Sequence, residues 1–171
     1  MKFIADIMVG KLARYLRMAG YDVIYINDIE DEEILSIAKK ESRTILTRDV
    51  LMLQRKDCKK GVIKSLLIKD DSLLSQLEQV KRELDLELKP KLIRCLDCNT
   101  LLDEASKEDL KEKVPPYVFK TQDNFLYCPD CDKYYWRGTH YDSINNVFKV
   151  LNKNLQSSGS TNIYQDKSSN K

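Results

Sequence analysis

The chain has 171 residues, of which 42% are hydrophobic and 33% are charged. This length accommodates one domain of ordinary size and a small second unit, because domains most often contain about 100 to 150 residues. The 29 basic and 27 acidic residues leave a formal net charge of only +2. The net charge therefore does not indicate a nucleic-acid or membrane partner. A phosphate-binding surface would depend on the local placement of Lys and Arg.

The N-terminal sequence and the cysteine content indicate the compartment. No run approaches the roughly 18 consecutive apolar residues of a membrane span, and MKFIADIMVGKL meets a charge too early for a secretory signal. We therefore expect a cytoplasmic protein with no membrane partner. Five cysteines in such a chain favour metal binding over a disulfide framework.

Residues 1–88 alternate short β-rich runs with longer amphipathic stretches. Strands are expected at residues 2–5, 22–26, 44–47 and 65–69, and helices at 8–19, 31–41, 50–56 and 72–88. Repeated βα units of this length predict a mostly parallel sheet with helices covering its faces. The predicted fold class is α/β.

Two changes in composition divide the chain. Near Lys89 and Pro90 the βα pattern gives way to a segment that contains paired cysteines, adjacent prolines and several aromatic residues. From Asn152 onward the sequence is almost entirely polar and cannot bury enough surface to offset the entropy of ordering. We expect a first domain at residues 1–88, a small second domain at 89–150 and a disordered tail at 151–171.

The second domain carries two Cys-x-x-Cys pairs, Cys95 with Cys98 and Cys128 with Cys131. Four thiolates suit the closed tetrahedral coordination of structural zinc, and the two-residue spacing lets both members of a pair reach one ion. The alternatives are a redox pair or reduced core cysteines. We expect a structural Zn²⁺, whose chelation unfolds residues 92–141 before the first domain.

Acidic residues follow every predicted strand of the first domain. In an open parallel sheet, the binding crevice lies outside the carboxyl ends of the strands. The acids at these positions are Asp6, Asp28, Asp31, Asp49, Asp70 and Asp71. Clustered carboxylates suit Mg²⁺ or Mn²⁺, which can activate water for phosphodiester hydrolysis. The pattern indicates metal-dependent nuclease chemistry.

Helix capping is the alternative role for these acids. Asp is favoured at N-caps, and acidic residues suit the first turn of a helix. On this interpretation Asp31 is an N-cap, Asp49 lies in a first turn, and Asp70 or Asp71 caps the helix after Ser72. Asp6 fits capping least, because it precedes an apolar pair rather than a charged helix start.

Basic residues recur at three-residue spacing in the helix expected at 8–19. Lys11, Arg14 and Arg17 would share one flank of this helix, one turn beyond Asp6. There they could hold phosphates beside the carboxylates. The alternative is an ordinary solvated helix face.

Aromatic and basic residues also follow the second cysteine pair, in KYYWRGTHY. Aromatic faces and Arg are what single-stranded RNA recognition uses, through stacking and phosphate contacts. Trp136 could instead belong to the small core of the zinc domain. We expect some of these rings to pack inward, while Arg137 and His140 face outward.

The ordered combination of motifs resembles a known family. FIAD, GKLARYLRMAGYD, NDIEDEEIL and TILTRD, followed by RCLDC and YCPDC with YWRGTHY, are similar to the PIN-like RNase domain named after the C-terminal part of the mutator-seven exonuclease. The resemblance covers about residues 1–145. It implies a PIN-like metal-dependent ribonuclease domain fused to a zinc ribbon. By similarity, the acidic site would be Asp6, Asp31 and Asp49, and the zinc ligands Cys95, Cys98, Cys128 and Cys131.

The resemblance leaves two positions of the acidic site open. PIN nucleases usually carry a fourth acid after the fourth strand, and both Asp70 and Asp71 fit that position. Asp28 likewise competes with Asp31.

Three functional hypotheses follow. The leading one is an endoribonuclease that uses Mg²⁺ or Mn²⁺ at Asp6, Asp31 and Asp49, while the zinc ribbon binds RNA or a ribonucleoprotein. Ribosomal and transfer RNA are candidate substrates, and a homodimer is open alongside a monomer. The alternatives are a non-catalytic RNA-binding or ribosome-associated module and a toxin-type PIN protein with a cognate antitoxin.

Overall fold

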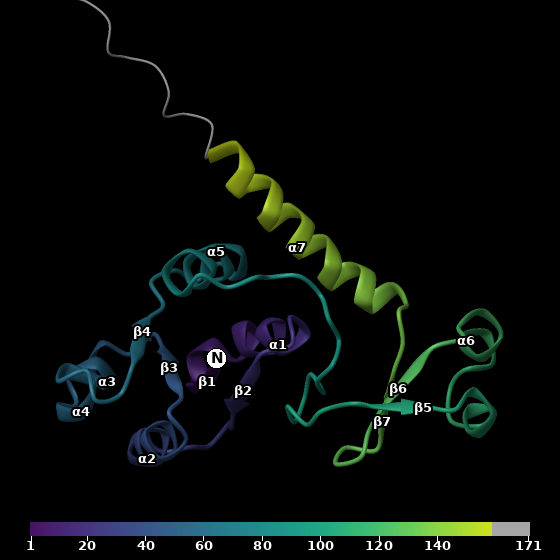
Figure 1. The fold of residues 1–171 in the computed structure, drawn as a ribbon, viewed down its shortest axis with the longest axis horizontal. Coiled ribbons are helices and arrows are strands. Elements are labelled where there is room, and N and C mark those ends of the chain that lie inside the picture. The colour runs from purple at the N-terminus through teal and green to yellow at the C-terminus, as the bar shows by residue number, and fades with distance from the viewer. Residues whose placement is uncertain (159–171) are drawn as a thin grey trace, which may run out of the picture.

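The computed structural model describes residues 1–158. The chain forms an elongated molecule with a parallel sheet and an antiparallel sheet at opposite ends of its long axis (Figure 1). None of the helices in this described part is long and apolar enough to cross a membrane.

The first sheet confirms the predicted α/β class. Its strands are β1 (Lys2–Ala5), β2 (Asp22–Tyr25), β3 (Thr44–Thr47) and β4 (Ser65–Leu67). Their order is β2-β1-β3-β4, and every neighbouring pair is parallel. The first and third predicted strands have the predicted bounds, whereas the second and fourth end earlier. Because β1 and β3 are neighbours, the residues that follow them meet at one edge.

Four helices and one 3₁₀ turn connect these strands, and a fifth helix, α5, follows β4. They are η1 (Ile7–Val9), α1 (Gly10–Met18), α2 (Asp31–Glu41), α3 (Val50–Gln54), α4 (Lys56–Lys59) and α5 (Leu73–Leu84). The helix predicted at 50–56 is broken at Arg55, whose ψ of 137° is not helical. The helix predicted at 72–88 ends at Leu84, because Asp85 adopts a left-handed conformation with φ 50°.

The central strands β1 and β3 are buried on both faces of the sheet. Successive side chains of a strand point to opposite faces, so Phe3 and Ile4 enter different clusters. Phe3 packs in the cluster that contains residues of α1 and α5, such as Leu12 and Leu77. Ile4 packs in the cluster that contains Ile34 of α2. Figure 1 shows α1 and α5 on one side of the sheet and α2 on the other.

The second sheet is antiparallel and small. Its strands β5 (Asp103–Ala105), β6 (Phe125–Cys128) and β7 (Lys133–Tyr135) lie in that order. The 3₁₀ turn η2 (Lys107–Leu110) and α6 (Pro116–Thr121) lie between β5 and β6. Leu110, Val114 and Phe125 form a separate core, and the ring of Trp136 lies edge-on to Phe125 at 6.3 Å between centroids.

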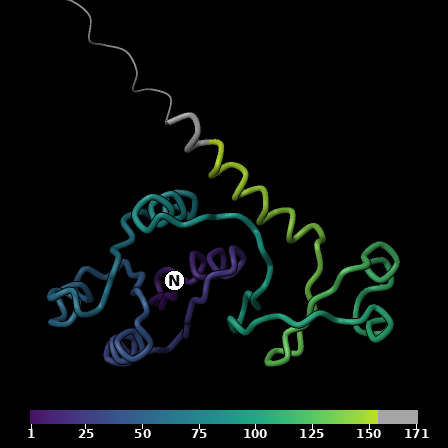
Figure 2. The backbone as a smooth tube through the Cα atoms, in the orientation of Figure 1, coloured from purple at the N-terminus to yellow at the C-terminus, as the bar shows by residue number. Residues whose placement is uncertain are grey.

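Helix α7 (Thr139–Ser158) returns to the first domain, as the backbone trace in Figure 2 shows. Ile144, Phe148 and Leu151 recur at helical spacing and are buried in the cluster that contains α1 and α5. The ring of Phe148 lies 5.9 Å from that of Tyr15. Residues 139–150 therefore pack with the first domain rather than with the ribbon alone.

The tail predicted at 151–171 does not begin at residue 151. Residues 151–158 continue α7, and Leu151 is 0% exposed. Its burial completes an apolar stripe that the polar composition of the surrounding sequence conceals. The remaining part of the predicted tail lies outside the described residues.

Candidate metal centres and nucleic-acid interface

Asp6 lies directly after β1 and is only 7% exposed. Its Oδ1 accepts a hydrogen bond of 2.7 Å from the amide of Met8, which makes Asp6 the N-cap of η1. Its Oδ2 accepts hydrogen bonds from the hydroxyl of Thr47 and from the amide of Arg48 at 3.2 Å. Asp6 thus caps a helical turn, the role that its sequence context favoured least.

Thr47 joins Asp6 to Asp49. While its hydroxyl donates to Asp6, its Oγ1 accepts a hydrogen bond of 2.8 Å from the amide of Asp49. Asp49 is the N-cap of α3 and accepts a hydrogen bond of 2.7 Å from the amide of Leu51. The fold therefore places Asp6 and Asp49 on one edge, two hydrogen bonds apart through a fully buried threonine.

Thr47 was not among the residues predicted from the sequence. The signal was present in TILTRD, because a hydroxyl that ends an apolar strand two residues before Asp can bond the following backbone amide. What the sequence does not contain is its second partner, Asp6, which neighbours it only after β1 and β3 pair.

Asp31 forms an ion pair with Arg55, which lies between α3 and α4. The N-cap of α2 is Glu30, so the prediction that Asp31 is the N-cap is wrong, and Asp31 is instead the first helical residue. Nη2 of Arg55 lies 3.3 Å from the carboxylate of Asp31 and 3.0 Å from that of Glu32. Asp28 is exposed in the turn between β2 and α2.

The two acids after β4 have different partners. Asp70 accepts a hydrogen bond of 2.8 Å from the amide of Ser72, immediately before α5. Asp71 forms an ion pair with Arg48, which precedes Asp49 in the loop after β3. Both side chains are exposed at the same edge of the sheet.

The four cysteines converge at the other candidate centre. In the described part of the chain they are the one group of three or more Cys, His, Asp or Glu side chains that could hold a single ion, with all sulfurs within 4.8 Å of one another. The Sγ atoms of Cys95 and Cys131 are 3.8 Å apart, and those of Cys98 and Cys128 are 3.4 Å apart. Zinc–sulfur bonds of about 2.3 Å in a tetrahedron require sulfur separations of about 3.8 Å. The cluster therefore fits a structural zinc.

Hydrogen bonds shape this cluster. Burial favours the neutral thiol of Cys98, but hydrogen bonds with Thr100 outweigh burial and lower the pKa of Cys98 to about 6. Thiolate is the form that binds metal. The hydroxyl of Tyr135 contacts Sγ of Cys95 at 3.1 Å and so packs β7 against the first pair.

Arg17 connects the first cysteine pair to the first domain. It is only 3% exposed, and its Nε donates to the carbonyl of Val23 at 2.9 Å. Its Nη1 donates to the carbonyls of Leu96 and Asp97 at 3.0 and 2.7 Å. Burial lowers the pKa of Arg17. The prediction that Arg17 shares an exposed basic flank with its helix neighbours is therefore wrong.

Asn99 makes the second connection, at the outer edge of β2. Its Oδ1 accepts a hydrogen bond of 2.9 Å from the amide of Val23, and its Nδ2 donates to Asp22 at 2.8 Å. Asn99 has a left-handed backbone with φ 77°, a conformation that Asn tolerates better than most residues. The cysteine loop thus covers the unpaired edge of the parallel sheet.

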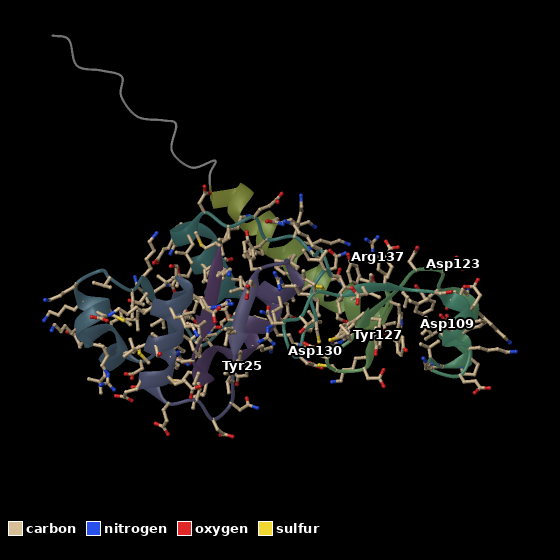
Figure 3. The ribbon with its side chains drawn as sticks, turned by 60° about the horizontal axis from the view of Figure 1, so that its bottom comes forward. Tyr25, Asp109, Asp123, Tyr127, Asp130 and Arg137 are labelled. Carbon is tan, nitrogen blue, oxygen red and sulfur yellow. The ribbon has the colours of Figure 1, made fainter. Side chains whose placement is uncertain are left out.

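The candidate RNA-binding residues lie on the surface between the two sheets. Lys11 and Arg14 are exposed, and Nη2 of Arg14 lies 3.4 Å from Nε2 of His140 at the start of α7. Arg137 is exposed, as expected, with its guanidinium 5.7 Å from the ring centre of Tyr141 (Figure 3). Trp136 is partly buried against the ribbon core. Segments from both ends of the chain therefore meet here.

Comparison with known proteins connects this geometry to a family. The sequence profile of the Mut7-C RNAse domain matches residues 1–148. The chain belongs to the Mut7-C RNAse domain family. Comparisons with curated proteins and with solved structures gave no match. The family confirms the resemblance found in the sequence and indicates a ribonuclease-type function with RNA as the implied substrate.

The matched range includes both candidate centres of this Mut7-C RNAse domain. It begins before Asp6 and ends after Cys131, within α7. The acidic edge and the four-cysteine cluster are thus parts of one family unit rather than a nuclease domain with an unrelated appendage.

Proposed function

We propose that this chain is an endoribonuclease of the cytoplasm that depends on Mg²⁺ or Mn²⁺ bound at Asp6 and Asp49. Asp31 would join as a third ligand only after its side chain moves, because among the described residues these three acids do not form a preformed group of ligands. The observation that carries the proposal is the hydrogen-bonded link from Asp6 through Thr47 to Asp49. It joins the carboxylate of Asp6 to the backbone of Asp49, whose own carboxylate is held by the amide of Leu51, at the edge of the sheet where ligands of open parallel sheets bind.

The remaining hydrogen-bonding capacity of these carboxylates fits a metal ion. A carboxylate offers about four lone-pair sites, and Asp6 uses three of them for Met8, Thr47 and Arg48. Asp49 accepts the amide of Leu51 at Oδ1, which leaves Oδ2 for another ligand. Mg²⁺ is commonly held by one or two carboxylates together with waters and substrate phosphates. Such an ion would activate water and neutralise charge on the phosphate.

Two arginines at this edge would bind the negatively charged phosphates of the substrate. Arg55 contacts Asp31 and Glu32, and Arg48 contacts Asp71. For Asp31 to act as a metal ligand, it must exchange its contact with Arg55. A phosphate provides the competing anion, because guanidinium binds phosphate and carboxylate alike.

Substitution of the linked carboxylates tests this proposal. We expect Asp6→Asn and Asp49→Asn each to abolish Mn²⁺-stimulated cleavage of single-stranded RNA while leaving the far-ultraviolet circular dichroism spectrum intact. The matched control is Asp109→Asn, an exposed aspartate at the distant end of the ribbon (Figure 3). Full cleavage by both site variants would exclude these residues from the chemistry.

A second candidate function is a non-catalytic RNA-binding module. It is favoured by the structural contacts that Asp6, Asp31, Asp49 and Asp70 already make. This alternative predicts RNA binding with no turnover in Mg²⁺ or Mn²⁺. The zinc ribbon would bind RNA or a ribonucleoprotein in either case, and ribosomal and transfer RNA remain the substrates that we would assay first.

A further inference from the structure

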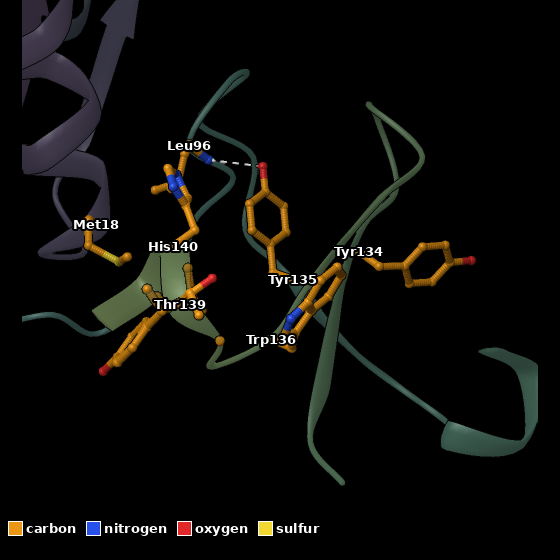
Figure 4. A pocket seen from close by; sticks show the side chains of 10 residues that line it. Met18, Leu96, Tyr134, Tyr135, Trp136, Thr139 and His140 are labelled. Carbon is orange, nitrogen blue, oxygen red and sulfur yellow. Dashed lines mark hydrogen bonds between the residues drawn. The ribbon is translucent and has the colours of Figure 1, made fainter. Parts of the chain in front are cut away.

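We propose that a pocket between the ribbon and the first domain binds one unpaired nucleobase of the RNA. This inference rests on the proposed action on RNA and specifies how the substrate is held. The pocket has a volume of about 230 Å³ and is walled by the end of α1, the first cysteine loop, β7 and the start of α7 (Figure 4).

The size and lining of the pocket suit a flat aromatic ligand. Pockets for drug-sized ligands usually measure about 300–1,000 Å³, so this one fits a single small ring system. Tyr135, Trp136 and Tyr141 supply aromatic faces, and Thr139 and His140 supply polar atoms. Every nucleobase has a face that stacks on such rings and an edge that hydrogen-bonds to polar groups.

The walls are fixed by a contact between two lining residues and by packing against the ribbon core. The hydroxyl of Tyr135 accepts a hydrogen bond of 3.3 Å from the amide of Leu96, drawn in Figure 4. Trp136 packs edge-on against Phe125 of the ribbon core. Gly138 lets the indole approach the backbone, because a Cβ there would lie 2.7 Å from Nε1 of Trp136. A preformed pocket avoids part of the ordering cost of binding.

Two further recesses with basic residues adjoin the pocket. One shares Leu96 with it and is lined by Arg14, Tyr25 and Asn27. The other shares Tyr135 and Trp136 with it and is lined by Lys91 and Arg137. A nucleotide whose base enters the pocket would therefore have a cation on each side for its flanking phosphates.

The Arg14 recess leads toward the acidic edge. It includes Asn27, in the turn after β2, and Gly10, the residue that follows η1, the turn capped by Asp6. Within the described residues, no carboxylate forms an ion pair with Arg14 or Arg137. Asp97 also lines the Arg14 recess, and its carboxylate is paired with Lys133. This continuity favours RNA as the occupant, because phosphates along the recess would approach Asp6.

Intrinsic fluorescence provides a direct readout, since Trp136 is the only tryptophan of the chain. The zinc-loaded protein would be titrated without Mg²⁺ or Mn²⁺ with three probes: a single-stranded RNA octamer, an abasic octamer of equal charge and a duplex of equal length. We expect the single strand to quench Trp136 and to bind about tenfold more tightly than the abasic chain, the effect of stacking one base. Equal quenching by the abasic chain or by the duplex would overturn the proposal.

Two variants and a control locate the binding. Gly138→Ala displaces the indole, and Thr139→Phe fills the pocket from an exposed position at the start of α7. Each should weaken binding of the single strand about tenfold and leave binding of the abasic chain unchanged. Tyr117→Ala removes an aromatic ring that is 76% exposed on α6 and should change neither. If Tyr117→Ala weakens binding as much as the pocket variants do, the base does not occupy this pocket.

Repeating the titration with Asp6→Asn separates this inference from the nuclease proposal. Quenching that persists while cleavage is lost supports both. Cleavage by the wild-type protein without base-dependent quenching rejects the pocket alone. Base-dependent quenching by a protein that never cleaves rejects the nuclease alone.

Discussion

Arg17 donates a hydrogen bond of 2.7 Å to the backbone carbonyl of Asp97, midway between the cysteines of the first pair. The same guanidinium donates to Leu96 in that loop and to Val23 in β2. A buried cation with three carbonyl partners makes the cysteine loop and the parallel sheet one packed body. Loss of metal from the cysteine cluster is therefore expected to weaken the packing of the first domain as well.

Arg17→Gln should destabilise the protein by about 2–4 kcal/mol, because each buried carbonyl left without a donor costs about 1–3 kcal/mol. Arg14→Gln is the matched control on the same helix, at an exposed position, and should change stability by less than about 0.5 kcal/mol. Urea unfolding of the two variants measures the difference. Equal stabilities would show that the contacts of Arg17 contribute little.

Zinc removal should loosen β2 as well as the ribbon. The amide of Val23 is covered by Asn99, the residue after Cys98. We expect chelation, or Cys128→Ser, to accelerate hydrogen exchange at Val23 together with exchange in residues 92–141. This outcome differs from the order of unfolding predicted from sequence. Cys58→Ala, outside the cluster, is the control and should leave exchange at Val23 slow.

Replacement of Asp49 can separate its two roles. Asp49→Ser retains a good N-cap for the amide of Leu51, whereas Asp49→Ala loses it at a cost of about 1 kcal/mol. If Asp49 also binds the metal, both variants lose cleavage while the Ser variant keeps nearly wild-type stability. Thermal unfolding and an RNA cleavage assay on the same samples provide the comparison. An active Ser variant would leave Asp49 only as a cap.

Acid should weaken the contact between Asp22 and Arg43. Burial acts to raise the pKa of Asp22, but hydrogen bonds from Arg43 and Asn99 outweigh it and the net pKa is lowered. A depressed carboxyl pKa stabilises the fold above its unfolded value of about 3.9, and this stabilisation disappears as pH falls through the lower folded value. Asp22→Asn should therefore cost about 2 kcal/mol at pH 7.

The pH profile checks that interpretation of Asp22. The difference in unfolding free energy between wild type and Asp22→Asn should be constant from pH 7 to about pH 5 and should shrink below about pH 3.9. Because both proteins carry the same cysteines, their difference cancels the acid sensitivity of the zinc site. A difference that is independent of pH would assign the effect to packing.

Shortening the side chain of Leu151 tests whether α7 packs on the first domain through this residue. Leu151→Ala should cost about 2–4 kcal/mol, since Leu151 is 0% exposed in the cluster with α1 and α5. Val150→Ala, whose side chain is 46% exposed, is the neighbouring control and should cost less than about 0.5 kcal/mol. Similar effects of the two changes would indicate that α7 does not dock through Leu151.

The elements that the sequence predicted well depend on local signals. The strands at KFIA and TILT alternate with amphipathic helices, and hydrophobic period and helix ends are properties of neighbouring residues. The cysteine cluster was equally predictable from the sequence, because the two-residue spacing within each pair already places two thiolates close together. By contrast, the polar composition after Leu151 concealed that this residue completes a buried stripe with Ile144 and Phe148, because the partners of the stripe lie far away in the chain.

The sequence by itself determined the α/β class, the four thiolates and the acids that follow the strands, since these depend on residue type and local spacing. The tertiary structure decided which of those acids meet: β1 pairs with β3, and Thr47 then bonds Asp6 and the amide of Asp49 at once. It also decided that Arg17 is buried while Arg14 is exposed. The reason is physical, because a hydrogen bond is set by distance in space, which pairing and packing establish between residues remote in sequence.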